Sequence, residues 1–285
     1  MFAVDKDKLR DVVKTALIED VGSGDVTTEI SVLEDIRAVA SFVAREEFIL
    51  SGVFVVDEVF KQVDDSLRLS VMVNDGSVVC ENDCVMTVEG SAKSILTGER
   101  VALNFLQRMS GISTLTGKFT KEVEGTDAVI LDTRKTTPGL RFIEKYSVRV
   151  GGGTNHRFGL YDRFLFKDNH IAVAALNFRS DIDLIIRKAR SYKPSLKVEV
   201  EVDTIGQLKQ LLPSEPDIIL LDNFSIPDLC EAVSLAKGKA FLEASGGITL
   251  DTVRDVALTG VDGISVGALT YSYRAVDISL DMKLC

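Results

Sequence analysis

The sequence predicts an α/β protein in which an incomplete TIM-like α/β barrel follows an N-terminal α+β sandwich domain. Six short apolar runs succeed one another from about residue 128, and each stops at a polar residue or a glycine before a helical stretch. The middles of the last four runs lie roughly 20 to 23 residues apart, the length of one strand plus one helix, which is typical of parallel βα units. The sequence has no GxGxxG turn, so the number of equivalent units favours a barrel over a doubly wound sheet.

Length and composition indicate two folded domains. The chain has 285 residues, 46% of them hydrophobic, 27% charged and only five of them proline, which argues against extended disorder. Residues 1–110 are expected to form an N-terminal α/β sandwich domain, which the C-terminal segment 272–285 joins. Residues 111–271 are expected to form the α/β barrel and to carry the functional site.

The elements of the N-terminal domain follow from local patterns. Apolar residues at helical spacing predict an amphipathic helix over residues 1–20. Two β-rich stretches, residues 67–79 and 83–96, follow later in the domain. Thr97 is predicted to be the N-cap of a long helix over residues 97–113, which would connect the two domains.

Each apolar run of the second domain is predicted to be one strand of the barrel. Active sites of such barrels lie at the C-terminal ends of the strands. The residues predicted at these ends are charged, polar or glycine, which indicates a binding site there. They are Thr133, Arg134, Lys135, Lys167, Glu201, Asp222, Ser245, Gly246, Gly247 and Gly267.

Positive charge is concentrated in one segment of an acidic protein. Residues 132–170 contain eight arginines or lysines against four acids, a net charge of +4, and both histidines, His156 and His170. The whole chain carries −10, so the remainder carries −14. The cations of the segment alternate with glycines and apolar residues, so they belong to folded structure. We therefore predict a pocket for a small anion with several negative charges.

The negative net charge excludes several classes of partner. It repels nucleic acid and anionic lipid, and no stretch is apolar enough to span a membrane. Four cysteines without metal-ligand spacing, and charges throughout the first helix in place of a signal sequence, predict a cytoplasmic protein.

The candidate site residues fall into three chemical groups. Arginine binds carboxylates in a two-point geometry and lysine supplies a mobile charge for phosphate. Glycines in EASGGIT and SVGALT allow backbone amides to approach a phosphate, although SGG alone could be a plain turn. Glu201 and Asp222 could hold magnesium or ribose hydroxyls. Alternatively, Glu199 and Glu201 neutralise lysines inside the barrel, and both uses are compatible.

The motifs resemble those of the quinolinate phosphoribosyltransferases over nearly the full length. The matching stretches are EDVGSGDVTT, LTGERVALNFLQRMSGIST, TRKTTPGLRFIEKYSVRVGGGTNHRFGLYDRFLFKDNHI, VEVEVDT, ILLDNF, EASGGIT and TGVDGISVGALT. The resemblance implies that quinolinate reacts with phosphoribosyl pyrophosphate (PRPP), with Mg²⁺, to give nicotinate mononucleotide, pyrophosphate and CO2 in NAD biosynthesis. It also implies a homodimer, or a higher oligomer, with active sites shared between subunits.

The same resemblance assigns roles to individual residues. The quinolinate carboxylates would be held by Arg134, Lys135, His156 and Arg157, near Thr133, with Arg100 reaching in from the neighbouring subunit. The phosphates would be met by Lys135 and Lys167, the ribose hydroxyls and Mg²⁺ by Glu201 and Asp222, and the 5′-phosphate by Ser245, Gly246, Gly247, Gly267, Ala268 and Leu269. Lys135, Lys167, Glu201 and Asp222 are the predicted catalytic residues. Tyr271 departs from the family pattern, because many members have a histidine there.

Three alternatives remain open from the sequence. A pyrophosphorylase-like protein found with molybdenum transport systems shares some motifs, but it typically lacks the lysine that is Lys167 here. A barrel lyase or aldolase would use Lys167 as a Schiff base. A non-catalytic anion-binding module would keep the pocket without turnover.

Overall fold

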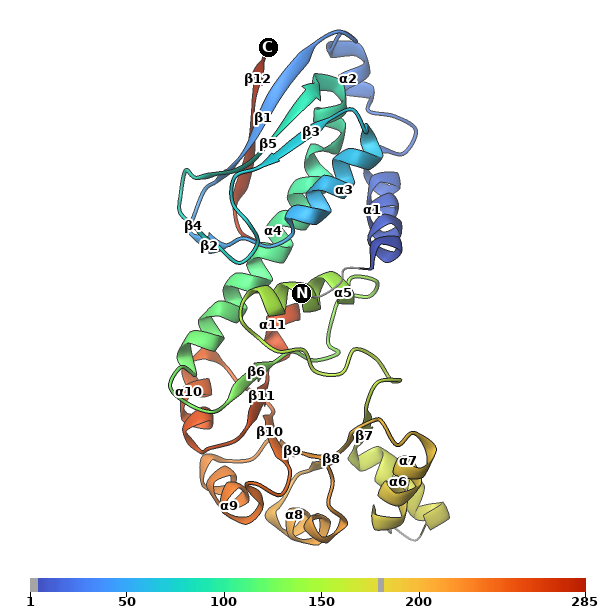
Figure 1. Cartoon of the computed structure of the whole chain (residues 1–285), viewed down its shortest axis with the longest axis vertical. Helices are drawn as coiled ribbons and strands as arrows, with labels where there is room; N and C mark the ends of the chain where they lie inside the picture. The colour runs from blue at the N-terminus through green and yellow to red at the C-terminus, as the bar shows by residue number, and fades with distance from the viewer. Residues whose placement is uncertain (1–4, 179–181) are drawn as a thin grey trace. The chain divides into compact units, whose positions relative to one another are not determined.

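The computed structural model describes residues 5–178 and 182–285 and consists of two compact units (Figure 1). The first unit comprises residues 1–117, 137–152 and 272–285, and the second comprises residues 118–136 and 153–271.

The first unit is built on a four-stranded antiparallel sheet in the order β12-β1-β5-β3. Its strands are β1 (Arg37–Ala44), β3 (Arg68–Val71), β5 (Cys84–Ser91) and β12 (Ile278–Leu284), and a small sheet pairs β2 (Phe48–Ile49) with β4 (Val78–Val79). Every second residue of β1 is buried, as expected of a strand with one face on a core. The helices of this unit are α1 (Lys6–Val21), α2 (Val26–Ser31), α3 (Val53–Val63), α5 (Arg141–Val150) and the first part of α4 (Ala92–Glu122).

The start of the long helix α4 differs from the prediction. Thr97 is not its N-cap, because the helix begins five residues earlier at Ala92. The side chain of Ser91 accepts a hydrogen bond from the main-chain N–H of Ser94 at 3.3 Å and so provides the cap. Gly98 lies within the helix, where the side chains of Phe60 and Val63 pack closely against it.

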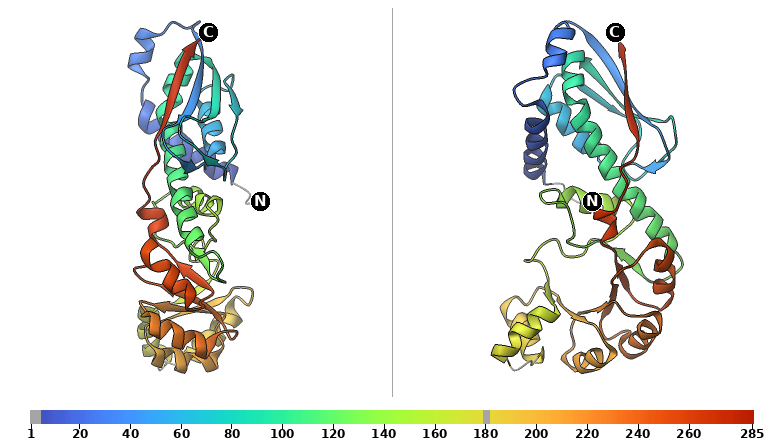
Figure 2. Two further views of the ribbon diagram at one scale, coloured as in Figure 1. Left: turned by 90° about the vertical axis from the view of Figure 1, so that its left-hand side faces the viewer. Right: turned by 180° about the vertical axis from the view of Figure 1, so that it is seen from behind.

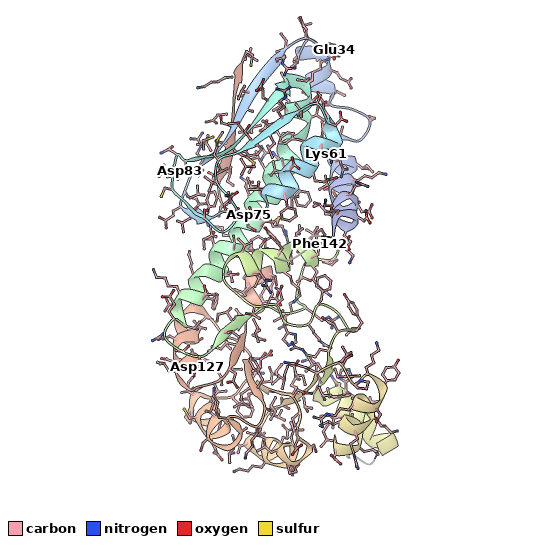
Figure 3. All side chains as sticks on the ribbon, in the orientation of Figure 1. Glu34, Lys61, Asp75, Asp83, Asp127 and Phe142 are labelled. Atoms are coloured by element: carbon pink, nitrogen blue, oxygen red, sulfur yellow. The ribbon has the colours of Figure 1, made fainter. Side chains whose placement is uncertain are left out.

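The division of the chain differs from the predicted domain boundaries in two respects. The boundary falls within α4, between residues 117 and 118, and residues 137–152 belong to the first unit and not to the barrel. The reason for the second difference is the packing of α5. The hydroxyl of Tyr146 donates a hydrogen bond of 2.8 Å to Asp75 (labelled in Figure 3). The centre of the Tyr146 ring lies 4.8 Å from the centre of the Phe54 ring.

The second unit contains a six-stranded parallel sheet in the order β6-β11-β10-β9-β8-β7. All six predicted strands are present, as β6 (Val129–Leu131), β7 (Phe164–Phe166), β8 (Val198–Val202), β9 (Ile218–Asp222), β10 (Phe241–Ser245) and β11 (Gly263–Ser265). The first and last strands of this order, β6 and β7, do not pair, so the sheet is an incomplete barrel, as predicted.

Helices line the outer side of this sheet, as Figures 1 and 2 show for α8, α9 and α10. The helices of the second unit are α6 (Asp168–Phe178), α7 (Ile182–Tyr192), α8 (Ile205–Leu211), α9 (Ile226–Ala236), α10 (Leu250–Leu258) and α11 (Ala268–Tyr271), with a 3₁₀ turn over Leu212–Ser214. Thr204 and Gln207 form a capping box at the start of α8, and Ser225 caps α9, so these helices begin at fixed points just after their strands. No helix in the described ranges is both long and apolar enough to cross a membrane.

Candidate active site

A cavity of about 450 Å³ lies at the C-terminal ends of the strands of the second unit. Most of the predicted site residues line it, and the lining residues come from β7, β9, β10 and β11 and from the segments that follow β6 and β7. The lining residues are Thr133, Arg134, Lys135, His156, Arg157, Leu165, Lys167, Leu220, Asp222, Glu243, Ser245 and Ser265. The cation wall, by which we mean Arg134, Lys135, Arg157 and Lys167, is therefore gathered in one cavity.

The cations of this wall influence one another. Burial, and after it the charge of Arg134, lowers the pKa of Arg157 from its ordinary value, although the nearby carboxylates of Glu199 and Asp162 oppose this. Like charges held together in a partly desolvated cavity repel each other until an anion enters. The wall is thus suited to a ligand with more than one negative charge.

Lys167 is held at the end of β7 by two contacts. Its ammonium group donates to the carboxylate of Glu201 on the neighbouring strand β8. Its main-chain N–H donates to Nδ1 of His170 at 3.2 Å. His170 therefore braces the loop that contains Lys167, and the pairing of Glu201 with a lysine that the sequence suggested is present.

His156 lies in a buried cluster together with Glu199, Glu243 and Arg163. Its Nε2 atom is 3.3 Å from a carboxylate oxygen of Glu199 and 3.3 Å from one of Glu243. Arg163 donates to the other oxygen of Glu199 at 3.1 Å, and Ser265 donates to Glu243. Burial raises the pKa of Glu199, but the hydrogen bond with His156 and the charge of Arg163 outweigh burial, and the pKa lies below its ordinary value.

The same contacts determine the protonation of His156. Burial alone would lower its pKa, but the hydrogen bonds to Glu199 and Glu243 raise it to about 9. The main-chain N–H of Arg157 donates to Nδ1 at 2.7 Å, so in this geometry the ring proton is on Nε2. A second proton on the ring would break that bond from Arg157.

The cluster of His156, Glu199 and Glu243 does not fit a metal ion, although its three possible ligand atoms lie within 4.8 Å of one another. A metal on Nε2 would place the ring proton on Nδ1, facing the Arg157 N–H that donates there. Arg163 also contacts both Glu199 and His156 from one side and would repel a cation.

A second acidic cluster fits a hard divalent cation better. Carboxylate oxygens of Glu201, Asp203 and Asp222 lie within 4.8 Å of one another at the ends of β8 and β9. Oxygen ligands of this kind suit Mg²⁺, which prefers one or two carboxylates together with water or substrate phosphates. The two predicted metal residues are thus close together, and Asp203 is a third member that the sequence did not single out for this role.

The predicted phosphate loops contain glycines that the local packing requires. Gly246 has a φ of 103°, and a Cβ there would lie 2.2 Å from the side chain of Asn223. A Cβ on Gly267 would lie 2.7 Å from the ring of Tyr271 and 3.1 Å from the Lys135 side chain. Both glycines therefore allow the strand-end loops to approach each other closely, whether or not a phosphate is bound.

Several predicted residues do not line the cavity themselves. Glu201 lies on β8, Gly246, Gly247 and Gly267 lie in the adjoining loops, and Ala268 begins α11. Leu269 has a fully buried side chain, so only its main chain could meet a ligand. Arg100 lies on α4 in the first unit, where 60% of its side chain is exposed.

The sequence analysis missed several polar residues of this region. Glu243 and Ser265 line the cavity, and Arg163 and the fully buried Asp132 support His156, since Asp132 accepts the His156 main-chain N–H at 2.8 Å. The sequence does contain a pattern that could have identified two of these residues. Glu243 precedes Ser245 by two residues and Ser265 precedes Gly267 by two, so strand alternation places each on the same face as a predicted site residue.

Comparison with known proteins identifies the family. The model of the quinolinate phosphoribosyl transferase N-terminal domain matches residues 25–110, and that of the C-terminal domain matches residues 112–281. The nicotinate-nucleotide pyrophosphorylase [carboxylating] of Mycobacterium leprae is 44% identical over 97% of this chain and 98% of its own length, and the probable enzyme of that name from Bacillus subtilis is 37% identical over 97% and 94%. The structure of the nicotinate-nucleotide pyrophosphorylase from Francisella tularensis superimposes with a TM-score of 0.92 at 40% identity, covering 99% of this chain and 98% of that one. With both domain models matched in order over nearly its whole length, the chain belongs to the quinolinate phosphoribosyltransferase family.

Proposed function

We propose that the protein transfers the phosphoribosyl group of PRPP to quinolinate and releases pyrophosphate and CO2, forming nicotinate mononucleotide. The observation that carries this proposal is the cation wall in a single cavity, next to a cluster of carboxylates at the same strand ends. The relatives named nicotinate-nucleotide pyrophosphorylase [carboxylating] support the same activity. A dicarboxylate and a polyphosphate together supply the negative charge that such a wall needs.

The residues of the chain act by binding and orientation. Arg134 and Arg157 are suited to the two carboxylates of quinolinate because each guanidinium offers paired donors. Lys135 and Lys167 are suited to the departing pyrophosphate, whose negative charge grows as the C–O bond of PRPP breaks. The pyridine nitrogen attacks the anomeric carbon, so the ring and the ribose must be held in line. No nucleophile of the protein is needed.

Decarboxylation follows from the first step. Once the ring nitrogen carries the ribose it is positively charged, and it can accept the electrons left at C2 when CO2 departs. A proton then replaces the lost carboxylate at C2. The protein needs only to keep the ring in place and to exclude competing groups during this step.

Magnesium is proposed to bind together with PRPP at Glu201 and Asp222, with Asp203 beside them. Its chemistry there would be to neutralise phosphate charge and to hold the ribose hydroxyls near the carboxylates. Lys167 already donates to Glu201, so its ammonium group lies beside the carboxylates that would hold the ion.

We also propose that two subunits share each active site. Arg100 is on the first unit, and its exposed guanidinium is available to a neighbouring molecule. In this arrangement Arg100 adds one more cation to the quinolinate carboxylates of the partner's site. Whether dimers assemble further does not affect this contact.

The assay for the proposed function is release of labelled CO2 from quinolinate labelled in its 2-carboxylate. Release should require both PRPP and Mg²⁺, and nicotinate mononucleotide should appear in equal amount. Quinolinate binding by calorimetry without CO2 release would favour the non-catalytic module. Covalent trapping of substrate by borohydride would favour a Schiff-base enzyme that uses Lys167.

A further inference from the structure

Glu243 is a buried carboxylate at the wall of an anion-binding cavity. It lies on β10, its side chain is about 1% exposed, and it lines the same cavity as the cation wall. One oxygen accepts from Ser265 and is close to His156, but the other oxygen, Oε2, is buried and has no hydrogen-bond partner among the residues that the structure describes.

Glu199 on β8 is a useful comparison, because it precedes the predicted site residue Glu201 by two residues, as Glu243 precedes Ser245. Both of its oxygens have partners, because Arg163 donates to one and His156 is near the other, and it does not line the cavity. No lysine or arginine in the described ranges forms an ion pair with Glu243, and it shares His156 with Glu199. A buried carboxylate with an unsatisfied oxygen destabilises a fold, so its presence in a binding cavity points to a role with the ligand.

The proposed reaction produces a positive charge in this cavity. Quinolinate enters as a dianion with a neutral ring nitrogen. As that nitrogen bonds to the anomeric carbon, positive charge develops on the ribosyl group and then remains on the pyridinium ring. A fixed negative charge nearby would disfavour the dianion in the ground state and favour the cationic transition state, which is the condition for accelerating the step.

On this basis, and resting on the proposed function, we propose that Glu243 is a catalytic residue whose carboxylate stabilises the positive charge that develops on the ring nitrogen and the ribosyl group. The residue forms no covalent bond and transfers no proton in this role. It acts through the short distance and the low dielectric constant of a buried site.

The test is the isosteric substitution Glu243→Gln, which removes the charge and keeps an oxygen that can accept from Ser265. We expect kcat for CO2 release to fall by about tenfold or more, with KM for quinolinate unchanged or lower and KM for PRPP within about twofold of the parent. Glu231→Gln on α9, which neutralises an exposed partner of Lys209, is the control and should behave as the parent.

A reduced kcat without a raised KM for quinolinate separates this role from a structural one. A kcat within about threefold of the parent, or a raised KM for quinolinate with unchanged kcat, would overturn the proposal. If the parent enzyme itself released no CO2 from quinolinate with PRPP, the proposed function would fail and not only the role of Glu243.

A binding measurement keeps the proposal testable if the variant does not fold, which a thermal melt will reveal. Two probes, N-methylpyridinium-2,3-dicarboxylate and benzene-1,2-dicarboxylate, have the same carboxylates, but only the first has a positive ring nitrogen. Calorimetry should show that the parent prefers the cationic probe, and Glu243→Gln should reduce that preference. Equal affinity of the parent for both probes would contradict the proposal.

Discussion

The pH dependence of stability should reveal the charge of His156. Its pKa in the folded protein is raised from 6.5 to about 9 by Glu199 and Glu243. Because the folded-state value lies above the unfolded one, protonation favours folding, and the stabilisation is complete below pH 6.5 and is lost as the pH rises to about 9. At about 1.4 kcal/mol per pKa unit the full effect is about 3 kcal/mol, or roughly 5 to 10 °C in melting temperature.

The measurement compares thermal unfolding of the parent and of His156→Gln between pH 6 and pH 9.5. The difference in melting temperature between the two proteins should shrink as the pH rises, while His170→Gln, which removes the exposed histidine, should follow the parent's pH profile. Parallel curves for parent and His156→Gln would refute the reasoning. That outcome would mean that the Arg157 N–H keeps Nδ1 unprotonated throughout this range.

Three further predictions concern turnover. Arg134→Ala and Lys167→Ala should each reduce the rate of CO2 release by roughly two orders of magnitude or more, since each removes a charge-assisted contact to a desolvated anion; near-normal steady-state kinetics would contradict the assignment. Arg100→Ala and Lys167→Ala subunits, each inactive alone, should regain roughly a quarter of parental activity when equal amounts are mixed and allowed to exchange, and no recovery would remove the shared-site proposal. Chelation of divalent ions should abolish turnover, and Glu201→Gln or Asp222→Asn should raise the Mg²⁺ concentration needed to restore it; an unchanged requirement in both variants would argue against metal binding there.

The barrel could be predicted from the sequence because its evidence is local and repeated. Each strand is a short apolar run that ends at a polar residue, so β6 and β9 were found without knowledge of their neighbours. The boundary between the units could not be found in the same way. α5 follows a barrel strand in the sequence, and only its contacts, such as that between Tyr146 and Asp75, assign it to the first unit.

The start of α4 shows a similar limit. Thr97 followed by glycine resembles a helix start, yet the chain is already helical from Ala92. The residue that caps the helix, Ser91, is also the last residue of β5. A strand that passes directly into a helix leaves no loop signal in the sequence. The preference of threonine for N-cap positions therefore indicated Thr97 in place of Ser91.

Residues at the strand ends could be singled out from the sequence, whereas the residues that support them could not. Arg134, Lys167 and Asp222 stand at strand ends, where the barrel architecture alone indicates function. Arg163 lies just before the apolar residues of β7, and its role depends on Glu199, thirty-six residues later. Such a pairing is invisible until both strands are placed side by side.

The supporting residues explain how the four cations of the wall can lie together at one cavity. Arg157 and Arg134 repel each other, and this repulsion contributes to the lowered pKa of Arg157. Glu199 and Glu243 lie two residues before predicted site positions on their strands, so strand alternation places them one layer deeper on the same face. The negative charge of these two glutamates offsets part of the repulsion between Arg157 and Arg134. The two are not equivalent, however, because Glu199 is neutralised by Arg163 while Glu243 keeps an unsatisfied oxygen. One carboxylate can therefore support the fold of the site while the other remains able to respond to charge that develops during the reaction.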